Sequence, residues 1–476
     1  METLGCPKNQ VDSDKIQGLL VQDGMVAADA PEEADLVVVN TCAFIEEARQ
    51  ESVDTVLELR KAVAGAELVV TGCMAERYGT ELAEALPEVD RVAGFGVPVS
   101  IGAKPPAVAP SAQDRSASAA LSAAQDRPVR AALSAAQDRP ALAALSPAQD
   151  LPAFDLLNLP RPPVEAPWAY VKIAEGCDRR CGYCAIPGFR GPQRSRSAED
   201  IEREVEGLGV REVVLVAQDL ASYGRDQGKG ERGIIPLVES LRRRVDWVRL
   251  LYLYPSDLTD PLIDAICATG VPYFDLSLQH VSRPLLARMR RWGDGDRFAA
   301  RIADIRRRRP EAVLRSNFII GYPGETEADH DALLDFVAEV RLDWCGFFTY
   351  SAEEGTHSVT LDGEVPAELA AERRRELAEV QDGITAARRD QLIGRDIEVL
   401  VDAPGVARSY REAPEIDGII IVPEHLPAGR FHTVRVVDAR GVDLVAEVAS
   451  PAGDTAPAED AAPAVVEAPS ARVGGS

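Results

Sequence analysis

Long hydrophobic runs are absent from this sequence of 476 residues. No apolar stretch approaches the roughly 18 residues that a helix needs to span a membrane. The chain also does not open with a basic segment followed by an apolar one, the pattern of a secretory signal peptide. We therefore expect a cytoplasmic protein without a membrane span. With 46% hydrophobic and 27% charged residues, its composition is that of a chain that folds around a core.

Positive charge is also scarce, because 52 Lys and Arg are set against 77 Asp and Glu, a net charge of −25. Nonspecific nucleic-acid affinity rests on contacts of Lys and Arg with phosphates, so a wide RNA-binding surface is not expected. A basic protein partner suits this charge better. Arg306 to Arg309 form a local basic run, which we interpret as the solvated end of a helix.

Composition divides the chain into five segments, with boundaries at residues 1–104, 105–161, 162–393, 394–449 and 450–476. Residues 1–104 alternate helical patterns, at 11–21 and 46–63, with buried-strand runs at 36–39 and 68–70, which predicts a parallel α/β domain. Residues 162–393 repeat the alternation often enough to predict a full or partial β/α barrel. In that segment, Ser197 and Asp200 are spaced to cap the start of a helix.

The other three segments have different patterns. Residues 105–161 repeat every twelve residues and are rich in Ala and Pro, which favours a disordered linker over a partly helical spacer. Residues 394–449 contain short strand runs separated by turn residues, which predicts a small β barrel of the OB type. Residues 450–476 are rich in Ala, Pro and acidic residues, and we expect a disordered tail.

Three of the eight cysteines, Cys177, Cys181 and Cys184, form a C-x3-C-x2-C motif after a predicted strand at residues 169–173. Three thiolates do not complete a tetrahedral zinc site, and no other Cys or His lies near them in the sequence, although a distant fourth ligand is the alternative. They suit three corners of a 4Fe–4S cluster whose fourth iron stays open. An open iron can chelate S-adenosylmethionine (SAM), which predicts reductive cleavage of SAM to a carbon radical at the mouth of the barrel.

A second set of cysteines, Cys6, Cys42 and Cys73, is dispersed in the sequence, but each follows a strand run or its expected place. The carboxyl ends of parallel strands meet at one edge of a sheet, so three loops there can converge. This pattern predicts a second 4Fe–4S cluster, and three ordinary buried cysteines are the alternative. Cys267 and Cys345 have apolar neighbours, and we assign them to packing.

The order of these motifs resembles that of the methylthiotransferases, which combine an N-terminal cluster domain, a radical SAM barrel and a C-terminal TRAM domain. The resemblance covers nearly the whole chain except the repeat linker and the tail, and the pattern of six cysteines is highly specific. It implies that Tyr183, at the aromatic position of the C-x3-C-x2-C motif, lies near the SAM adenine. A ring that only packs beside the loop is the alternative for Tyr183.

Two branches of this family differ in substrate: one modifies an adenosine of tRNA, the other an aspartate of the twelfth small-subunit ribosomal protein. The local sequence is more similar to the ribosomal-protein branch, in Gly5-Cys6-Pro7-Lys8-Asn9, Cys184-Ala185-Ile186-Pro187, Ser277-Leu278-Gln279-His280 and Tyr350-Ser351-Ala352-Glu353-Glu354-Gly355-Thr356. Residues 395–449 contain six Arg and ten Asp plus Glu, and an acidic barrel suits a basic ribosomal protein better than tRNA.

The resemblance implies that a radical made from SAM removes hydrogen from the β-carbon of the aspartate, which then takes a methylthio group from the second cluster. That chemistry needs an electron donor. Only Met1 to Leu4 precede Gly5, where the family has a full strand, and we expect the true start to lie upstream. A non-catalytic iron–sulfur or zinc protein that binds a ribosomal partner is the rival hypothesis of a different class.

Overall fold

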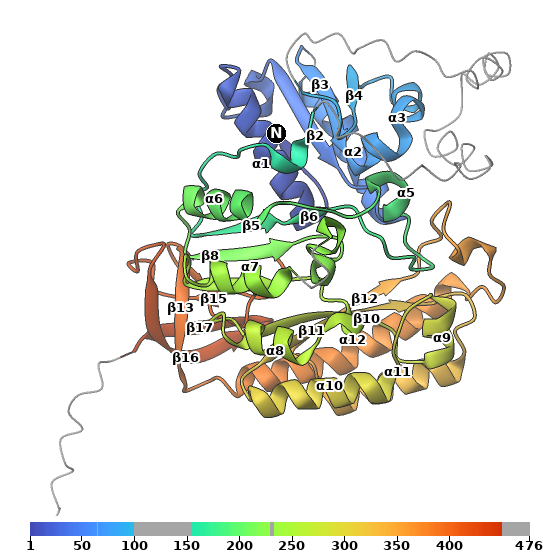
Figure 1. Cartoon of the computed structure of the whole chain (residues 1–476), viewed down its shortest axis with the longest axis vertical. Helices are drawn as coiled ribbons and strands as arrows, with labels where there is room; N and C mark the ends of the chain where they lie inside the picture. The colour runs from blue at the N-terminus through green and yellow to red at the C-terminus, as the bar shows by residue number, and fades with distance from the viewer. Residues whose placement is uncertain (64, 100–153, 229–232, 450–476) are drawn as a thin grey trace, which may run out of the picture.

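The computed structural model of the chain describes residues 1–63, 65–99, 154–228 and 233–449 (Figure 1). Three units follow one another: an N-terminal α/β domain, a central layer of strands with helices outside it, and a small β barrel at one end. Most of the predicted linker and the whole predicted tail lie outside the described residues. None of the helices in the described ranges is long and apolar enough to cross a membrane.

The N-terminal domain is a sheet of four parallel strands in the order β1-β2-β3-β4. Its strands are β1 (Glu2–Thr3), β2 (Leu36–Thr41), β3 (Glu67–Gly72) and β4 (Arg91–Ala93). Its helices are α1 (Pro7–Gln22), η1 (Pro31–Glu33), α2 (Glu46–Ala62) and α3 (Cys73–Ala85). The central strands β2 and β3 are buried on both faces, which explains their continuous rather than alternating apolar sequence.

Residues 154–161 differ from the prediction of a disordered linker up to residue 161. They include a 3-10 turn, η4 (Leu156–Asn158), in which Leu156 and Leu157 are buried. Leu156 packs in the same apolar cluster as Ile16 and Leu20 of α1. Composition alone misses this turn because two buried leucines suffice to hold a short segment against a helix.

The central domain contains two three-stranded parallel sheets, β5-β8-β9 and β10-β11-β12. A parallel bridge between Leu253 and Leu276 joins them, so six strands follow one another in chain order. The strands are β5 (Trp168–Lys172), β8 (Glu212–Val216), β9 (Trp247–Leu250), β10 (Tyr273–Gln279), β11 (Val313–Ile320) and β12 (Trp344–Thr349). A closed barrel of this type has eight strands. Of the two predicted forms, the full and the partial barrel, the structure therefore has the partial one.

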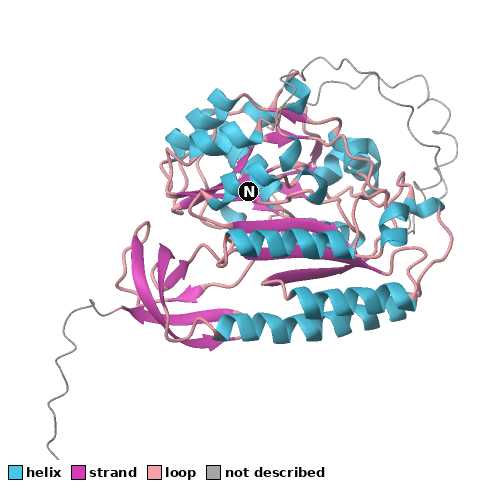
Figure 2. Cartoon of the chain, turned by 60° about the horizontal axis from the view of Figure 1, so that its bottom comes forward, coloured by secondary structure: helices cyan, strands magenta, loops and turns pink. Residues whose placement is uncertain are grey.

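Helices cover the outer face of these strands (Figure 2). They are α6 (Ala198–Leu208), α7 (Ile234–Leu241), α8 (Asp260–Cys267), α9 (Arg283–Arg288), α10 (Gly295–Arg308), α11 (Glu327–Val340) and α12 (Ala367–Asp390). Shorter elements are β6 (Ala174–Glu175), α5 (Ile186–Arg190), β7 (Arg194–Ser195), η5 (Leu220–Ser222), η6 (Arg225–Gln227), η7 (Pro255–Asp257) and η8 (Ser358–Thr360). The predicted cap of α6 is present, since the Ser197 hydroxyl accepts the Asp200 N–H at 3.1 Å.

The C-terminal unit is the predicted small barrel, closed in the order β13-β14-β15-β17-β16. Its strands are β13 (Asp396–Ala403), β14 (Val406–Arg408), β15 (Ile420–Ile421), β16 (Phe431–Arg440) and β17 (Asp443–Val448). Arg408 of this unit and Arg249 of β9 both bind Glu212, the first residue of β8, at 2.7 and 2.8 Å. The small barrel therefore docks at the amino ends of the central strands.

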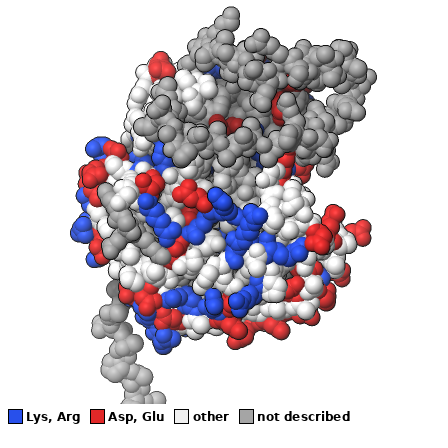
Figure 3. Space-filling model, turned by 45° about the vertical axis from the view of Figure 1, so that its right-hand side comes forward, with Lys and Arg blue, Asp and Glu red and all other residues white. Residues whose placement is uncertain are grey.

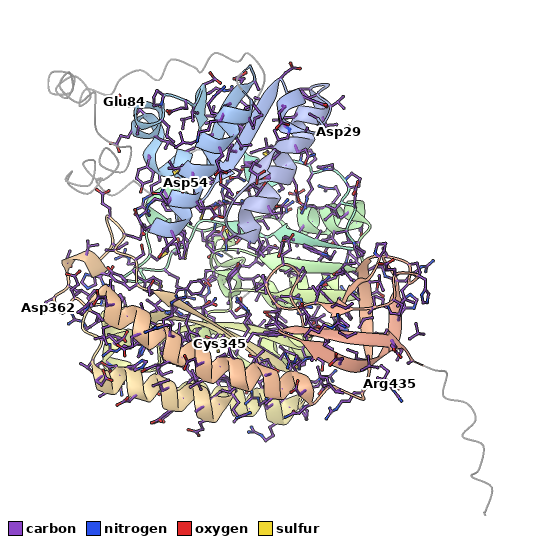
Figure 4. All side chains as sticks on the ribbon, turned by 180° about the vertical axis from the view of Figure 1, so that it is seen from behind. Asp29, Asp54, Glu84, Cys345, Asp362 and Arg435 are labelled. Atoms are coloured by element: carbon purple, nitrogen blue, oxygen red, sulfur yellow. The ribbon has the colours of Figure 1, made fainter. Side chains whose placement is uncertain are left out.

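The two cysteines assigned to packing lie apart from the other six. Cys267, at the end of α8, and Cys345, on β12, are both partly buried against the largest apolar core. Figure 4 shows Cys345 within the central domain, far from Asp54 on α2 of the N-terminal domain. Arg306 to Arg308 end α10 as predicted, and Arg307 and Arg308 pair with Asp304 one turn earlier.

Candidate iron–sulfur sites

The loop that carries Cys177, Cys181 and Cys184 leaves the central sheet at the carboxyl end of its first strand, β5, through the short strand β6. The hairpin of β6 with β7 closes the loop at its base, where the Cys177 N–H donates to the Gly191 carbonyl at 3.0 Å. Further along, the Gly182 N–H donates to the Met289 carbonyl at 2.8 Å, beyond the end of α9. The loop is thus held at the end of the barrel where active sites of this architecture lie.

Nitrogen donors already point at two of these sulfurs. The Arg179 backbone N–H lies 3.4 Å from the Cys177 Sγ, and the Arg291 guanidinium lies 3.5 Å from the Cys181 Sγ. Burial raises the pKa of Cys177 to about 11 and the pKa of Cys184 to about 12. Thiols in such surroundings ionise readily only with a cation beside them, and iron would supply that charge.

Tyr183 lies inside this loop and packs, partly buried, against the core of the barrel. Burial raises its pKa well above the usual range, although the Arg291 guanidinium opposes the shift. Tyr183 is therefore a neutral ring beside the cysteines. Its contact with the SAM adenine stays a prediction.

The second triad comes together at the carboxyl edge of the N-terminal sheet. Cys6 precedes the first turn of α1, Cys42 follows β2 directly, and Cys73 is the first residue of α3. Burial raises the pKa of Cys42 to about 12, and the negative charges of Cys6 and Cys73 add to this effect.

Close backbone packing holds this edge. The Asn9 side-chain amide donates to the carbonyls of Leu4, at 2.9 Å, and Thr41, at 3.1 Å, and so ties the first cysteine loop to the second. Gly5 adopts a φ of +95°, and a Cβ there would come within 2.8 Å of the Cys42 Cβ. Only glycine at position 5 lets the two loops approach this closely.

The donor set fits a multinuclear cluster better than one ion. Within the described ranges, no three Cys, His, Asp or Glu side chains approach closely enough to hold a single metal ion. In a cubic cluster each thiolate binds a different iron, so the three sulfurs lie farther apart than around one ion. The three thiolates of the Cys177–Cys184 loop are the ligand set of such a cluster with one iron left open.

Arg190, at the end of α5, contacts the N-terminal triad at Cys73 and the base of the loop that carries the other triad at Glu175. Its guanidinium lies 2.9 Å from the Cys73 Sγ and 2.7 Å from the Glu175 Oε1. Glu175 immediately precedes Gly176 and Cys177, and it also accepts a hydrogen bond from Lys172 of β5 at 2.7 Å. Sequence reasoning misses Arg190 and Glu175, because nothing in their spacing indicates that they meet the N-terminal domain.

A second contact between the domains is built on Glu353, in the loop after β12. Its buried carboxylate accepts hydrogen bonds from Arg49 of α2 at 2.6 Å and from Arg77 of α3 at 2.8 Å. Arg77 also donates to the carbonyl of Ala43, the residue after Cys42, at 3.0 Å. Glu353 belongs to the 350–356 sequence used above only as a mark of resemblance, and its docking role was not predicted.

These features define a class of protein. Six parallel strands in a partial barrel, with a C-x3-C-x2-C loop at the carboxyl end, are the hallmark of radical SAM enzymes, and here a second cysteine triad lies beside them. The chain matches three family models: the Radical SAM superfamily at residues 171–337, the TRAM domain at 393–449, and the uncharacterized protein family UPF0004 at 1–94. As a radical SAM enzyme, the chain uses SAM together with a 4Fe–4S cluster.

Curated relatives show to which family of radical SAM enzymes the chain belongs. A "Ribosomal protein uS12 methylthiotransferase RimO" of Moorella thermoacetica is 39% identical over 94% of this chain and 98% of its own length. The protein of the same name from Cutibacterium acnes is 41% identical over 94% of this chain and 97% of its own length. The chain belongs to the RimO family of radical SAM methylthiotransferases.

Solved structures share less with the chain. The radical S-adenosylmethionine methyltransferase TsrM of Kitasatospora setae is 13% identical, covers 83% of this chain and 71% of its own, and has a TM-score of 0.43.

Proposed function

We propose that the chain transfers a methylthio group to the β-carbon of an aspartate in ribosomal protein uS12, using two 4Fe–4S clusters. Cys177, Cys181 and Cys184 would hold the cluster that binds SAM, and Cys6, Cys42 and Cys73 the other. One observation carries this proposal: the two triads lie on either side of a single domain junction, and the Arg190 side chain reaches from Cys73 of one triad to Glu175, at the base of the loop that carries the other. The names of the curated relatives support the substrate.

The two cysteine triads have different roles in this proposal. A 4Fe–4S cluster with SAM on its open iron supplies a carbon-centred radical when bound. Each triad would contribute three thiolates to a four-iron cluster, so one iron would be left without a protein ligand. Cys42, Cys73 and Cys177 are buried, and exclusion of water from reactive species would be favoured around them. No acid–base pair is required of the protein, because an unactivated C–H bond is not broken by ordinary general bases.

The acidic C-terminal barrel supports a basic protein substrate, but it lies away from the cysteines. It docks at the amino ends of the central strands through Glu212, whereas the Cys177 loop lies at their carboxyl ends. At about 3.3 Å per residue, a strand the length of β10 puts roughly 20 Å between these ends. A substrate that reaches both regions must therefore span the height of the barrel, as a folded ribosomal protein does and a short peptide does not.

The rival substrate, tRNA, receives little support from the overall charge, yet the surface is not uniformly acidic. In the view of Figure 3, Lys and Arg gather in a band across the described face. We propose that tRNA is not the substrate, and we keep RNA as an explicit arm of the test. An external electron donor and a cytoplasmic location complete the proposal.

The test uses the whole chain, reconstituted anaerobically with iron and sulfide and incubated with SAM, a reductant and either free uS12 or a tRNA anticodon stem-loop. Mass spectrometry reads the methylthio group on the protein or the RNA, and chromatography reads the 5′-deoxyadenosine released from SAM. About eight irons per chain are expected for two cubic clusters. The variants are Cys181→Ala, in the first triad, Cys73→Ala, in the second, and Cys267→Ala as a matched control outside both.

The proposal expects methylthiolated uS12 from the unchanged chain and from Cys267→Ala. Cys181→Ala should release no 5′-deoxyadenosine. Cys73→Ala should keep about four irons and still cleave SAM, but give no methylthiolated uS12. Modification of the RNA alone would overturn the substrate, and a chain that binds zinc without cleaving SAM would favour the non-catalytic rival.

A further inference from the structure

The Arg190 side chain contacts both a cysteine of the N-terminal triad and the base of the Cys177–Cys184 loop. Its side chain is only 2% exposed, and its guanidinium divides its hydrogen bonds between the N-terminal domain and Glu175. One nitrogen lies 2.9 Å from the Cys73 Sγ and 3.0 Å from the Asn9 Oδ1, and the other lies 2.7 Å from Glu175. A rigid planar fork holds its partners at a fixed separation, which a flexible ammonium does not.

The position of Arg190 in the chain makes the contact informative. Helix α5 begins two residues after Cys184, and Arg190 is its last residue. Glu175 immediately precedes Gly176 and Cys177 at the other end of the same loop. The Arg190–Glu175 pair therefore joins both ends of the loop that carries the first triad, and the other half of the guanidinium reaches the second triad.

The surrounding charges show that this arrangement is built rather than incidental. Asp12 of α1 and Lys172 of β5 are both 1% exposed and form an ion pair across the same junction. Lys172 also binds Glu175, so two acids and two bases, from both domains, neutralise one another in a buried network. A buried charge is tolerated only with such partners, so the network fixes one relative orientation of the domains.

We propose that Arg190 is a positioning residue that couples the two cysteine sites, by holding the Cys73 sulfur at a fixed place relative to the Cys177–Cys184 loop. This inference rests on the proposed function. A radical formed at one site must meet the methylthio group held at the other, and misplacement by about 1 Å costs on the order of a hundredfold in rate. The N–H donated to Cys73 also stabilises a more negatively charged cluster, which raises its reduction potential.

The test compares Arg190→Lys with Arg194→Lys. Lysine keeps the positive charge at position 190, so the buried acids remain neutralised, but one ammonium does not reach both Cys73 and Glu175. Arg194, on β7, is the matched control, because its side chain pairs with Asp155 and, among the described residues, contacts neither triad. Iron content and thermal unfolding establish that each variant is folded and loaded.

The first readout is the amount of 5′-deoxyadenosine formed per methylthiolated uS12. We expect Arg190→Lys to cleave SAM within about threefold of the unchanged chain while the ratio rises at least tenfold. Arg194→Lys should leave the ratio unchanged. An unchanged ratio in a loaded Arg190→Lys protein would overturn the positioning role.

The second readout does not depend on turnover. In a chain carrying Cys177→Ala, Cys181→Ala and Cys184→Ala, only the N-terminal cluster remains, and its reduction potential can be titrated spectroscopically. Adding Arg190→Lys should shift that potential to more negative values, whereas Arg194→Lys should not. If the unchanged chain fails to modify uS12, the proposed function fails, but this titration still decides whether Arg190 acts on the N-terminal site.

Glu175→Gln provides a second variant for the same test if the Arg190→Lys protein binds too little iron. It removes the acid from the other half of the fork and leaves the contact between Arg190 and Cys73 in place. It should raise the ratio of 5′-deoxyadenosine to product, with a smaller shift in the potential of the N-terminal cluster than Arg190→Lys gives. A Glu175→Gln protein that couples the two steps normally would refute the bridge.

Discussion

Glu353 offers the sharpest test of how the N-terminal domain is held against the barrel. Glu353 is 2% exposed, and one of its carboxylate oxygens accepts hydrogen bonds from both Arg49 and Arg77. Its other oxygen accepts the Ser351 hydroxyl at 2.7 Å. Glu353→Gln preserves the shape of this side chain and removes only its charge, so the two arginines face a neutral acceptor.

The magnitude follows from the change in hydrogen-bond type. A bond to a charged partner contributes about 1.5–3 kcal/mol, and a neutral one about 0.5–1.5. Glu353→Gln changes two hydrogen bonds to a charged acceptor into bonds to a neutral one, and it leaves two guanidinium groups less well compensated by negative charge. Together these changes cost about 3 kcal/mol of docking free energy. Because 1.4 kcal/mol is a factor of ten, the junction should open on the order of a hundredfold more often.

Amide hydrogen exchange measures that opening directly. The Glu46 N–H, at the start of α2, donates to the Ser351 hydroxyl across the junction at 3.3 Å and should lose protection in Glu353→Gln. The adjacent Glu354→Gln is the matched control, because the Glu354 side chain forms no ion pair or hydrogen bond within the described part of the chain. If both variants exchange alike across residues 46–49 and 351–356, charge at Glu353 does not hold the domains together.

Two further predictions concern single positions. Burial lowers the pKa of His280 to about 4, and its Nδ1 accepts the Ser282 N–H at 3.1 Å. Its folded pKa lies below the unfolded value, so stability is lost as the pH falls from about 6.5 towards 4. Between pH 7 and 5, the unchanged chain should lose about 2 kcal/mol more unfolding free energy than His280→Gln, and parallel losses would refute the assignment. At Gly72, with a φ of +91°, a Cβ would lie 2.2 Å from the Asn40 Oδ1, so Gly72→Ala should cost about 3 kcal/mol or more in denaturant unfolding and reduce iron at the N-terminal site. Gly207→Ala, in helix α6, where a Cβ meets nothing within 4 Å and alanine favours the helix, should lower neither stability nor iron content, and equal behaviour of the two glycine variants would contradict the steric argument.

Much of the site could be anticipated from the sequence because its logic is local. Cys42 and Cys73 each follow an apolar run of strand length, and parallel strands carry such positions to one edge without further information. The spacing of Cys177, Cys181 and Cys184 is likewise a property of a single loop. The alternation of strand and helix patterns predicted a full or partial barrel. It did not predict how many strands the barrel would contain.

The contacts between the domains could not be predicted, since they join residues far apart in the chain. Arg190 and Cys73 are 117 positions apart, and Arg49 and Glu353 are 304 apart. Arginine and glutamate are common on surfaces, so their sequence gives no sign of burial. The turn at Leu156 and Leu157 was missed for the same reason, because its order comes from contact with α1 and not from its own composition.

The kind of contact at the junction bears on the proposed chemistry. The apolar cores of the N-terminal domain and of the barrel are largely separate clusters, and the space between them is crossed by ion pairs: Asp12 with Lys172, Arg190 with Glu175, and Glu353 with Arg49 and Arg77. Apolar surfaces adhere in many orientations, whereas buried hydrogen-bonded charges are satisfied in few. If transfer between two sites requires a fixed distance, these pairs supply it. Apolar side chains of similar volume in place of one pair should then preserve the docking free energy while SAM cleavage becomes uncoupled from product formation.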